Sequence, residues 1–167
     1  MTLVLVTGGA RSGKSRRAEL RTLSFPGRPT YIATAEALDS EMKERIAHHR
    51  ARRGPNWNLR EAPLELVAAL SDTDGDGPRL VDCLTLWLSN VMHANRNWRD
   101  ETSRLVGALA RQTAPVVLVT NEVGLGIVPD NALARAFRDA AGFVNQRIAE
   151  AADEVEFIVS GLPIRVK

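Results

Sequence analysis

Residues Thr2–Ser15 read TLVLVTGGARSGKS. Thr2–Thr7 is an uninterrupted run of aliphatic and β-branched residues, which is typical of a buried strand. Gly8, four intervening residues and then Gly13-Lys14-Ser15 complete the pattern G-x-x-x-x-G-K-[ST]. A strand before this pattern and a helix after it favour a P-loop over a chance glycine-rich turn. The stretch therefore predicts a binding site for a nucleoside triphosphate.

The spacing of this motif follows from the chemistry of phosphate binding. Glycines let the backbone turn so that successive N–H groups point at one phosphate, and the following helix adds its positive end. Lys14 is expected to reach the β- and γ-phosphates as a catalytic residue, and the Ser15 hydroxyl to ligate Mg²⁺. The predicted nucleotide-binding residues of the loop are Gly8, Gly9, Ala10, Arg11, Ser12, Gly13, Lys14 and Ser15.

Outward from this loop, apolar strand-like runs alternate with segments of helical period. Strands are predicted at Thr2–Thr7, Thr30–Thr34, Arg79–Cys83, Pro115–Thr120 and Glu154–Ser160. Helices are predicted at Lys14–Leu23, Leu38–Arg53, Leu64–Leu70, Leu84–Ala94, Asp100–Gln112 and Asn131–Ala152. Alternating elements with fully apolar strands indicate an α/β fold, a mostly parallel sheet with helices on both faces. We expect one catalytic domain over residues 1–167.

Composition narrows the class of protein further. The 167 residues are 44% apolar and 25% charged, the mix of an ordinary globular protein. The net charge of 22 − 20 = +2 does not indicate a nucleic-acid-binding surface. The single cysteine, Cys83, excludes an internal disulfide and fits a reducing compartment. With no leader-like segment and no apolar stretch near 18 residues, we expect a cytoplasmic protein without a membrane span.

A P-loop needs a carboxylate at the end of a neighbouring strand to hold Mg²⁺, directly or through water. Asp82 ends a predicted strand and is the best candidate, although it could instead cap the helix that follows. Glu122 is a second carboxylate at a strand end, where ligands of open α/β sheets bind. Ordering of the loop Gly124–Gly126 is an equally good interpretation of Glu122.

The predicted helix Leu38–Arg53 carries two histidines. At 100° per residue, His49 shares the apolar face with Met42 and Ile46, and His48 lies nearer the flank. His49 could simply be a core histidine. Basic residues crowd this segment, however, and neighbouring cations lower the pKa of an imidazole, which would leave a neutral ring available as a nucleophile. The same basic run could also be only a solvated face.

Several longer blocks carry a family resemblance. They are GGARSGKS, YIATA, RIAHHRARR, TNEVGLGIVP, RAFRDAAGFVNQ and VSGLP, in that order along the chain. With them the sequence closely resembles the bifunctional adenosylcobinamide kinase/adenosylcobinamide-phosphate guanylyltransferase family of cobalamin biosynthesis, from Leu3 to the end. Many NTPases share the P-loop, whereas the blocks Thr120–Pro129 and Arg135–Gln146 are far more specific to this family.

The resemblance implies a RecA-like P-loop fold, a homotrimer and two reactions. In the first, a nucleoside triphosphate, ATP or GTP, phosphorylates the aminopropanol hydroxyl of adenosylcobinamide. In the second, GTP guanylylates a histidine, and GMP then passes to adenosylcobinamide-phosphate to give adenosylcobinamide-GDP. The family's histidine motif falls on His49 rather than His48. Further guanine-nucleotide contacts implied by the resemblance are Ala33, Thr34, Ala35, Arg50, Ala51, Arg52, Arg53 and Glu61.

The sequence leaves alternatives open for the role of Glu61 and for the function of the protein. Glu61 suits the donor edge of guanine, but it could be an ordinary exposed loop carboxylate. A regulatory P-loop NTPase would need no histidine inside a basic cluster. A guanylyltransferase that lacks the kinase activity would retain every motif named above.

Overall fold

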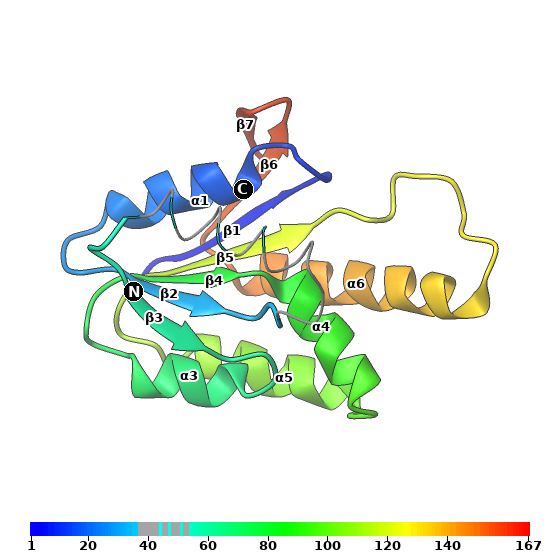
Figure 1. Cartoon of the computed structure of the whole chain (residues 1–167), viewed down its shortest axis with the longest axis horizontal. Coiled ribbons are helices and arrows are strands. Elements are labelled where there is room, and N and C mark those ends of the chain that lie inside the picture. The colour runs from blue at the N-terminus through cyan, green and yellow to red at the C-terminus, as the bar shows by residue number, and fades with distance from the viewer. Residues whose placement is uncertain (37–43, 45–46, 48–50, 52–53) are drawn as a thin grey trace.

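The computed structural model describes residues 1–36, 44, 47, 51 and 54–167 (Figure 1). Its elements are β1 (Leu3–Gly8), α1 (Lys14–Leu23), β2 (Thr30–Ala33), β3 (Asn58–Glu61), α3 (Leu66–Asp72), β4 (Arg79–Asp82), α4 (Leu84–His93), α5 (Trp98–Leu109), β5 (Val116–Asn121), α6 (Ala132–Ala151), β6 (Glu154–Val159) and β7 (Leu162–Arg165). Asn97 and Asn131 cap α5 and α6, because each side chain accepts a hydrogen bond from a backbone N–H of the first turn.

The strands form one seven-stranded sheet in the order β3-β2-β4-β5-β1-β6-β7. All neighbours pair in parallel except β6 and β7, which are antiparallel. β1 lies between β5 and β6, so the P-loop leaves the sheet beside the ends of two other strands. This is the arrangement in which ligands bind at the carboxyl ends of parallel strands.

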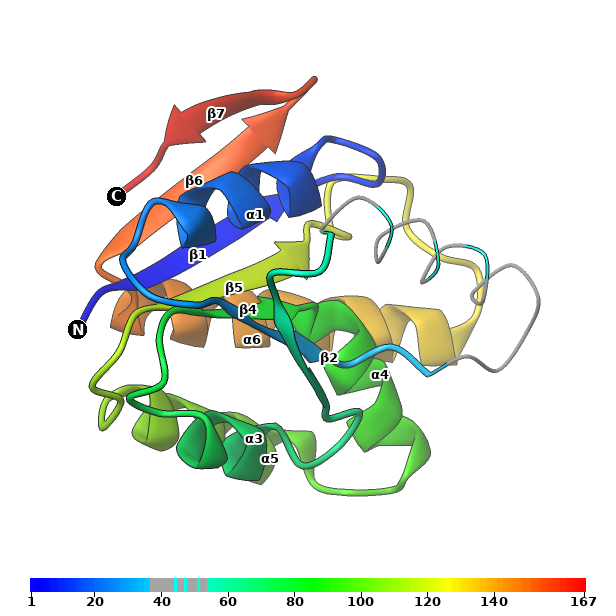
Figure 2. The same cartoon turned by 60° about the vertical axis from the view of Figure 1, so that its left-hand side comes forward.

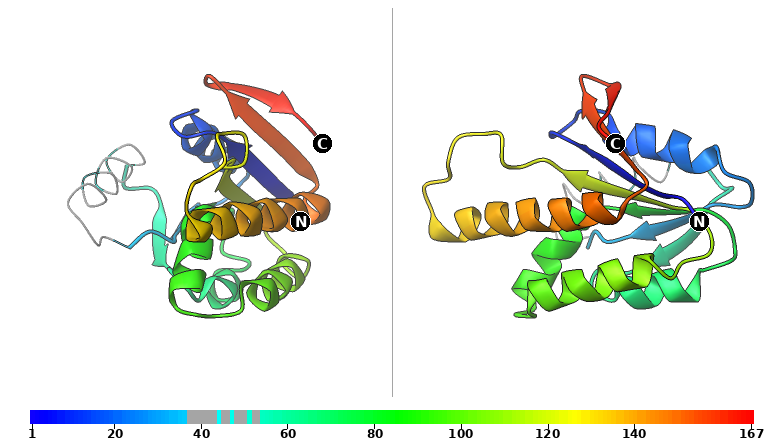
Figure 3. Two further views of the ribbon diagram at one scale, coloured as in Figure 1. Left: turned by 90° about the vertical axis from the view of Figure 1, so that its right-hand side faces the viewer. Right: turned by 180° about the vertical axis from the view of Figure 1, so that it is seen from behind.

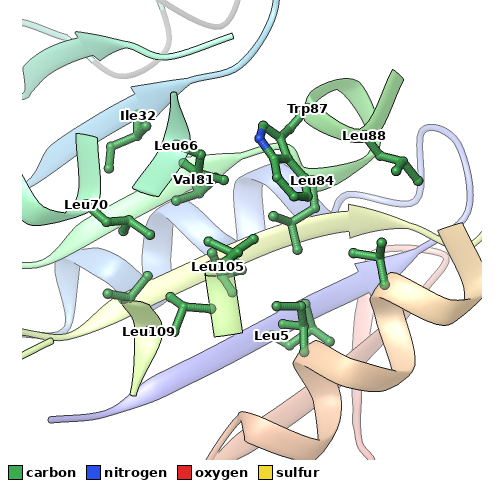
Figure 4. Close-up of a cluster of buried hydrophobic side chains, with 14 of the residues drawn as sticks. Leu5, Ile32, Leu66, Leu70, Val81, Leu84, Trp87, Leu88, Leu105 and Leu109 are labelled. Atoms are coloured by element: carbon green, nitrogen blue, oxygen red, sulfur yellow. The ribbon is translucent and has the colours of Figure 1, made fainter. Parts of the chain in front are cut away.

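Helices cover both faces of the sheet, and Figures 2 and 3 show the layers. On one face α1 packs through Ala18 on Val4, Val6, Val117 and Val119. The other face carries α3, α4, α5 and α6, whose side chains form the larger core shown in Figure 4. Because both faces are covered, β1 and β5 read as continuous apolar runs.

A buried ion pair fixes the loop between α3 and β4. The Arg79 side chain is completely buried and donates to the Asp74 carboxylate at 2.8 Å and to the carbonyl oxygen of Ala114, also at 2.8 Å. Asp74 also accepts hydrogen bonds from the backbone N–H groups of Thr113 and Ala114. The loop of residues 73–78 is therefore tied to the segment that leads into β5.

The expected fold class is confirmed, and the differences lie at the edges of the sheet. The five predicted strands and the predicted helices within the described residues are present, with no boundary shifted by more than three residues. β3 and β7 were not predicted. The first is short and polar and the second contains Pro163, features that edge strands tolerate and that hide them from pattern reading. Most of the predicted helix Leu38–Arg53 lies outside the described residues.

Among the described residues, no helix is both long enough and apolar enough to cross a membrane.

Candidate nucleotide-binding site

The P-loop connects β1 directly to α1. Gly8 is the last residue of β1, and Gly13 precedes Lys14, the first residue of α1, with a φ of 94°. A Cβ on Gly8 would lie 2.7 Å from the carbonyl oxygen of Ile158. Glycine is therefore required at Gly8 by close approach and favoured at Gly13 by its left-handed backbone.

The turn between β6 and β7 supports the loop from the side. The N–H of Gly161 donates to the carbonyl oxygen of Ser12 at 2.8 Å, and a Cβ on Gly13 would lie 3.2 Å from the Gly161 Cα. The block VSGLP of the sequence thus has a structural explanation: it packs this turn against the phosphate-binding loop.

Lys14 lies inside the loop rather than on the surface. Its side chain is buried, and the ammonium Nζ donates to the carbonyl oxygen of Gly9 at 3.0 Å. The cation is therefore held beside the loop's own backbone, where it can exchange a carbonyl partner for a phosphate oxygen. Ser15 follows at the second position of α1, as the predicted metal-binding role requires.

Strand alternation shows which side chains face the P-loop helix. Val117 and Val119 of β5 pack in the α1-side core, so Asn121 points to the same face. Leu80 of β4 belongs to that core too, which places Asp82 on the α1 face. The structure therefore brings Asp82 to the same face of the sheet as the P-loop and α1, with β5 between its strand and β1.

The helix-capping alternative for Asp82 is not found. The N-cap of α4 is Cys83 rather than Asp82. A carboxylate on one strand end and the Ser15 hydroxyl on α1 fit Mg²⁺, which usually keeps several waters and needs only one or two protein oxygens besides substrate phosphates. The described residues contain no cluster of three His, Cys, Asp or Glu side chains that could hold a metal alone.

Glu122 has the loop-ordering role. Its Oε1 atom accepts a hydrogen bond from the N–H of Gly124 at 2.5 Å. The carboxylate thus fixes the start of the segment between β5 and α6. Leu125, Ile127 and Val128 of this segment expose large apolar side chains, with Ile127 97% exposed.

Two of the guanine-contact candidates, Ala33 and Glu61, lie toward the other edge of the sheet. Ala33 at the end of β2 pairs with Glu61 at the end of β3 and with Asp82 at the end of β4. In-register partners of parallel strands share a face, so Glu61 is on the α1 face, and it is exposed. From β1 to β3 there are four strand spacings, about 19 Å at 4.8 Å each.

Thr34 is more deeply buried than Ala33 and Ala35 on either side of it. Its side chain is completely buried, and its Oγ1 atom donates to the carbonyl oxygen of Cys83 and accepts from the N–H of Cys83, both at 2.8 Å. The backbone carbonyl of Thr34 accepts from the Asn90 side chain at 2.9 Å. The hydroxyl thus joins the ends of β2 and β4, while Ala35 lies partly exposed beyond them.

The histidine and its arginines cannot be placed in this geometry. His49, Arg50, Arg52 and Arg53 lie outside the described residues, and Ala51 is exposed. Their roles stay predictions of the sequence.

Sequence reasoning missed a group of buried polar atoms around the P-loop. The side-chain oxygens of Ser12 and Asn121 are buried and have no hydrogen-bond partner among the described residues. Buried polar atoms are nearly always satisfied, so such atoms at one place indicate a site for a polar ligand. The signal in the sequence was the polar pair that follows the apolar run of β5, Thr120-Asn121.

The Cys83 thiol and an apolar pocket have no part in the proposed nucleotide site. Burial raises the pKa of the Cys83 thiol to about 11, so it is not a nucleophile at neutral pH. A pocket of about 490 Å³ lies between the end of α4 and the start of α6, lined mainly by apolar atoms that include those of Met92 and Phe137.

Comparison with known proteins identifies the family. A family model for cobinamide kinase / cobinamide phosphate guanyltransferase, named CobU, matches residues 4–166. The chain belongs to this family. It is 45% identical over 181 aligned positions to the bifunctional adenosylcobalamin biosynthesis protein CobU of Salmonella typhimurium, with 99% of each chain covered. It is 46% identical over 166 positions to the corresponding protein CobP of Pseudomonas aeruginosa, covering 98% of this chain and 96% of that one.

Solved structures show the same fold at low sequence identity. The flagellar accessory protein FlaH of Methanocaldococcus jannaschii matches with a TM-score of 0.55 and 13% identity, over 99% of this chain and 78% of that one. An ATPase of a bacterial type III secretion system matches with a TM-score of 0.59 and 12% identity, over 98% and 56% of the two chains. This member of the cobinamide kinase family therefore has the RecA-like fold of P-loop NTPases.

Proposed function

We propose that this enzyme phosphorylates adenosylcobinamide and then transfers GMP from GTP to adenosylcobinamide-phosphate through a guanylylated His49. The observation that carries the proposal is the shared face of the sheet. The P-loop, Asp82 and Glu61 all lie at the carboxyl ends of the strands on the side of α1. Family membership supplies the chemical class of the substrates.

In the kinase step, the P-loop backbone and Lys14 would hold the triphosphate of ATP or GTP. The oxygen of the substrate hydroxyl attacks the γ-phosphorus, and the bond from that phosphorus to the bridging oxygen breaks with its electron pair leaving on the diphosphate. Ser15 and Asp82 would hold Mg²⁺, which neutralises charge on the β- and γ-phosphates when it is bound. Positioning and charge stabilisation provide most of the catalysis in such reactions.

In the transferase step, an imidazole nitrogen of His49 attacks the α-phosphorus of GTP and pyrophosphate leaves. The phosphoramidate so formed keeps its transfer potential, and a phosphate oxygen of adenosylcobinamide-phosphate then displaces the histidine. The Glu61 carboxylate can accept hydrogen bonds from N1–H and N2–H₂ of guanine. The spacing of about 19 Å between β3 and β1 suits one GTP that lies along the edge of the sheet with its base toward Glu61.

We further propose a cytoplasmic homotrimer. The family resemblance suggests this assembly, and the exposed Leu125, Ile127 and Val128 support a contact between copies of the chain. Adjacent exposed apolar side chains of this size are typical of interaction surfaces.

The proposal is tested by mass spectrometry after incubation with GTP and Mg²⁺. A GMP adduct is expected on His49, labile in acid and stable in alkali as phosphoramidates are. His49→Ala should lose the adduct and guanylyl transfer but keep measurable phosphorylation of adenosylcobinamide, because a direct attack on the γ-phosphate needs no covalent intermediate. The matched control, His48→Ala, should keep both activities. An acid-labile adduct that survives His49→Ala and disappears in His48→Ala would contradict the assignment.

A further inference from the structure

We propose that the side-chain amide of Asn121 binds the terminal phosphate of the nucleotide in the P-loop and is a catalytic residue of phosphoryl transfer. The inference rests on the proposed kinase function for its substrate. The position of the Asn121 amide and its lack of a partner among the described residues come from the structure.

The position of Asn121 follows from the strand order. β5 lies between β4, which ends in Asp82, and β1, which ends in the P-loop. Asp82 pairs with Val119, whereas Asn121 is two residues further along and pairs with Gly8, the first glycine of the loop. Two residues of strand extend about 6.6 Å. Asn121 therefore lies at the mouth of the loop, between the loop and the strand that carries the metal-binding carboxylate.

The backbone of Asn121 is held on both sides. Its N–H donates to Thr85 Oγ1 at 2.8 Å, and its carbonyl oxygen accepts from Asn145 Nδ2 at 3.2 Å. Thr120 faces the opposite side of the sheet, where its hydroxyl donates to Asn145 Oδ1 at 2.7 Å. Asn145 and Thr85, from α6 and α4, thus fix the strand end from behind and leave the Asn121 side chain directed toward the α1 face.

The amide itself is not used by the protein. Its Oδ1 atom is buried without a hydrogen-bond partner among the described residues. Oxygen and nitrogen of such a group are distinguished only by their hydrogen bonds. An amide that is fixed in place but unpaired is suited to a ligand that brings its own partners, and a phosphoryl group brings acceptor oxygens.

The proposed contact acts on the phosphoryl group while it moves. As the bond from the substrate oxygen to the γ-phosphorus forms and the bond to the bridging oxygen breaks, negative charge lies on the equatorial oxygens. An N–H of Asn121 would donate to one of them, and the hydroxyl proton leaves to solvent. Such a fixed donor stabilises the transition state more than the bound substrate, so its loss lowers kcat more than it raises KM.

The experiment compares Asn121→Ala and Asn121→Asp with the wild-type protein and with Gln146→Ala, which removes an exposed amide from α6. For Asn121→Ala we expect kcat of adenosylcobinamide phosphorylation to fall about 100-fold, as for other single lost donors, with KM for the nucleotide changed by less than about threefold. Asn121→Asp should lose more, because its carboxylate repels the phosphate. Gln146→Ala should behave as wild type.

A second readout needs no cobinamide. In wild-type protein a non-hydrolysable triphosphate analogue should bind more tightly than the diphosphate, and in Asn121→Ala this preference should fall about tenfold, the equivalent of one charge-assisted hydrogen bond. If wild-type protein phosphorylates no cobinamide, the proposed function fails while this binding ratio still tests Asn121.

Three results would overturn the proposal. One is an unchanged kcat and an unchanged binding ratio in Asn121→Ala. Another is full activity of Asn121→Asp, which would make the amide an acceptor for a metal-bound water instead. The third is a loss of activity in Asn121→Ala that is matched by a lower melting temperature, since a buried amide oxygen without a partner contributes no hydrogen bond to the fold.

Discussion

Asp82 at the end of β4 and Ser15 in α1 are the two residues proposed to bind Mg²⁺ at the P-loop, one through a carboxylate and the other through a hydroxyl. We expect Asp82→Asn to keep the fold and to raise the Mg²⁺ concentration for half-maximal kinase rate by about tenfold or more, because the amide keeps the shape but loses the charge that attracts the cation. The measurement is a titration of kinase rate with Mg²⁺ at saturating nucleotide.

The matched control is Asp76→Asn, at an exposed aspartate in the loop between α3 and β4. It removes the same charge at a distance from the strand ends and should leave the titration unchanged. Equal Mg²⁺ requirements for Asp82→Asn and the wild-type protein would remove Asp82 from the metal site.

At the residue scale, the sequence could identify the P-loop from its spacing and could propose Asp82 because it ends an apolar run. It could not assign Thr34, whose hydroxyl bridges to Cys83, a residue 49 positions away in the chain. Asn121 was missed for the same reason. Its unpaired amide becomes significant only when β5 is placed between β4 and β1.

At the scale of elements, the junction of the α3–β4 loop with β5 depends on one buried ion pair. Burial of Asp74 raises its pKa, but hydrogen bonds from Ala114, Thr113 and Arg79 outweigh this effect and lower the pKa to about 2. A carboxylate with a depressed pKa contributes stability above its unfolded value of 3.8, and this contribution is lost as pH falls from 3.8 toward 2.

We therefore expect Asp74→Asn to lower the free energy of unfolding by about 2 kcal/mol at pH 7, the size of a lost hydrogen bond to a charged group. The difference from wild type should shrink as the pH is lowered toward 2. Urea unfolding across this pH range measures it, with the exposed Asp130→Asn as control. A difference that stays constant with pH would show that the Asp74 charge is not involved.

The elements also show where pattern reading succeeds. β1 and β5 are buried on both sides, so their apolar runs identify them as strands. β3 has only one buried partner strand and reads Asn-Leu-Arg-Glu, a sequence without apolar alternation. Its pairing with β2 is a tertiary effect, and it is this pairing that places Glu61 beside Ala33.

At the scale of the whole molecule, the proposed function places two reactions at one edge of one sheet. The P-loop pattern occurs once in the sequence, at Gly8–Ser15. Glu61, at the end of β3, lies about 19 Å away along the same edge, close to the length of an extended nucleoside triphosphate. A GTP that reaches from Glu61 to the P-loop would place its β- and γ-phosphates where the kinase nucleotide also binds.

If GTP binds as we propose, the two activities are mutually exclusive at any moment. We expect a non-hydrolysable ATP analogue to slow the labelling of the protein by GTP competitively, because both ligands need the backbone cradle and Lys14. The measurement is the initial rate of GMP incorporation over a range of GTP concentrations at several fixed concentrations of the analogue. Lys14→Ala should abolish both labelling and phosphorylation, since charge neutralisation at the β- and γ-phosphates precedes either step and such contacts contribute several kcal/mol. Labelling that continues at full rate while the analogue blocks the kinase completely would mean that the transferase GTP binds without the P-loop.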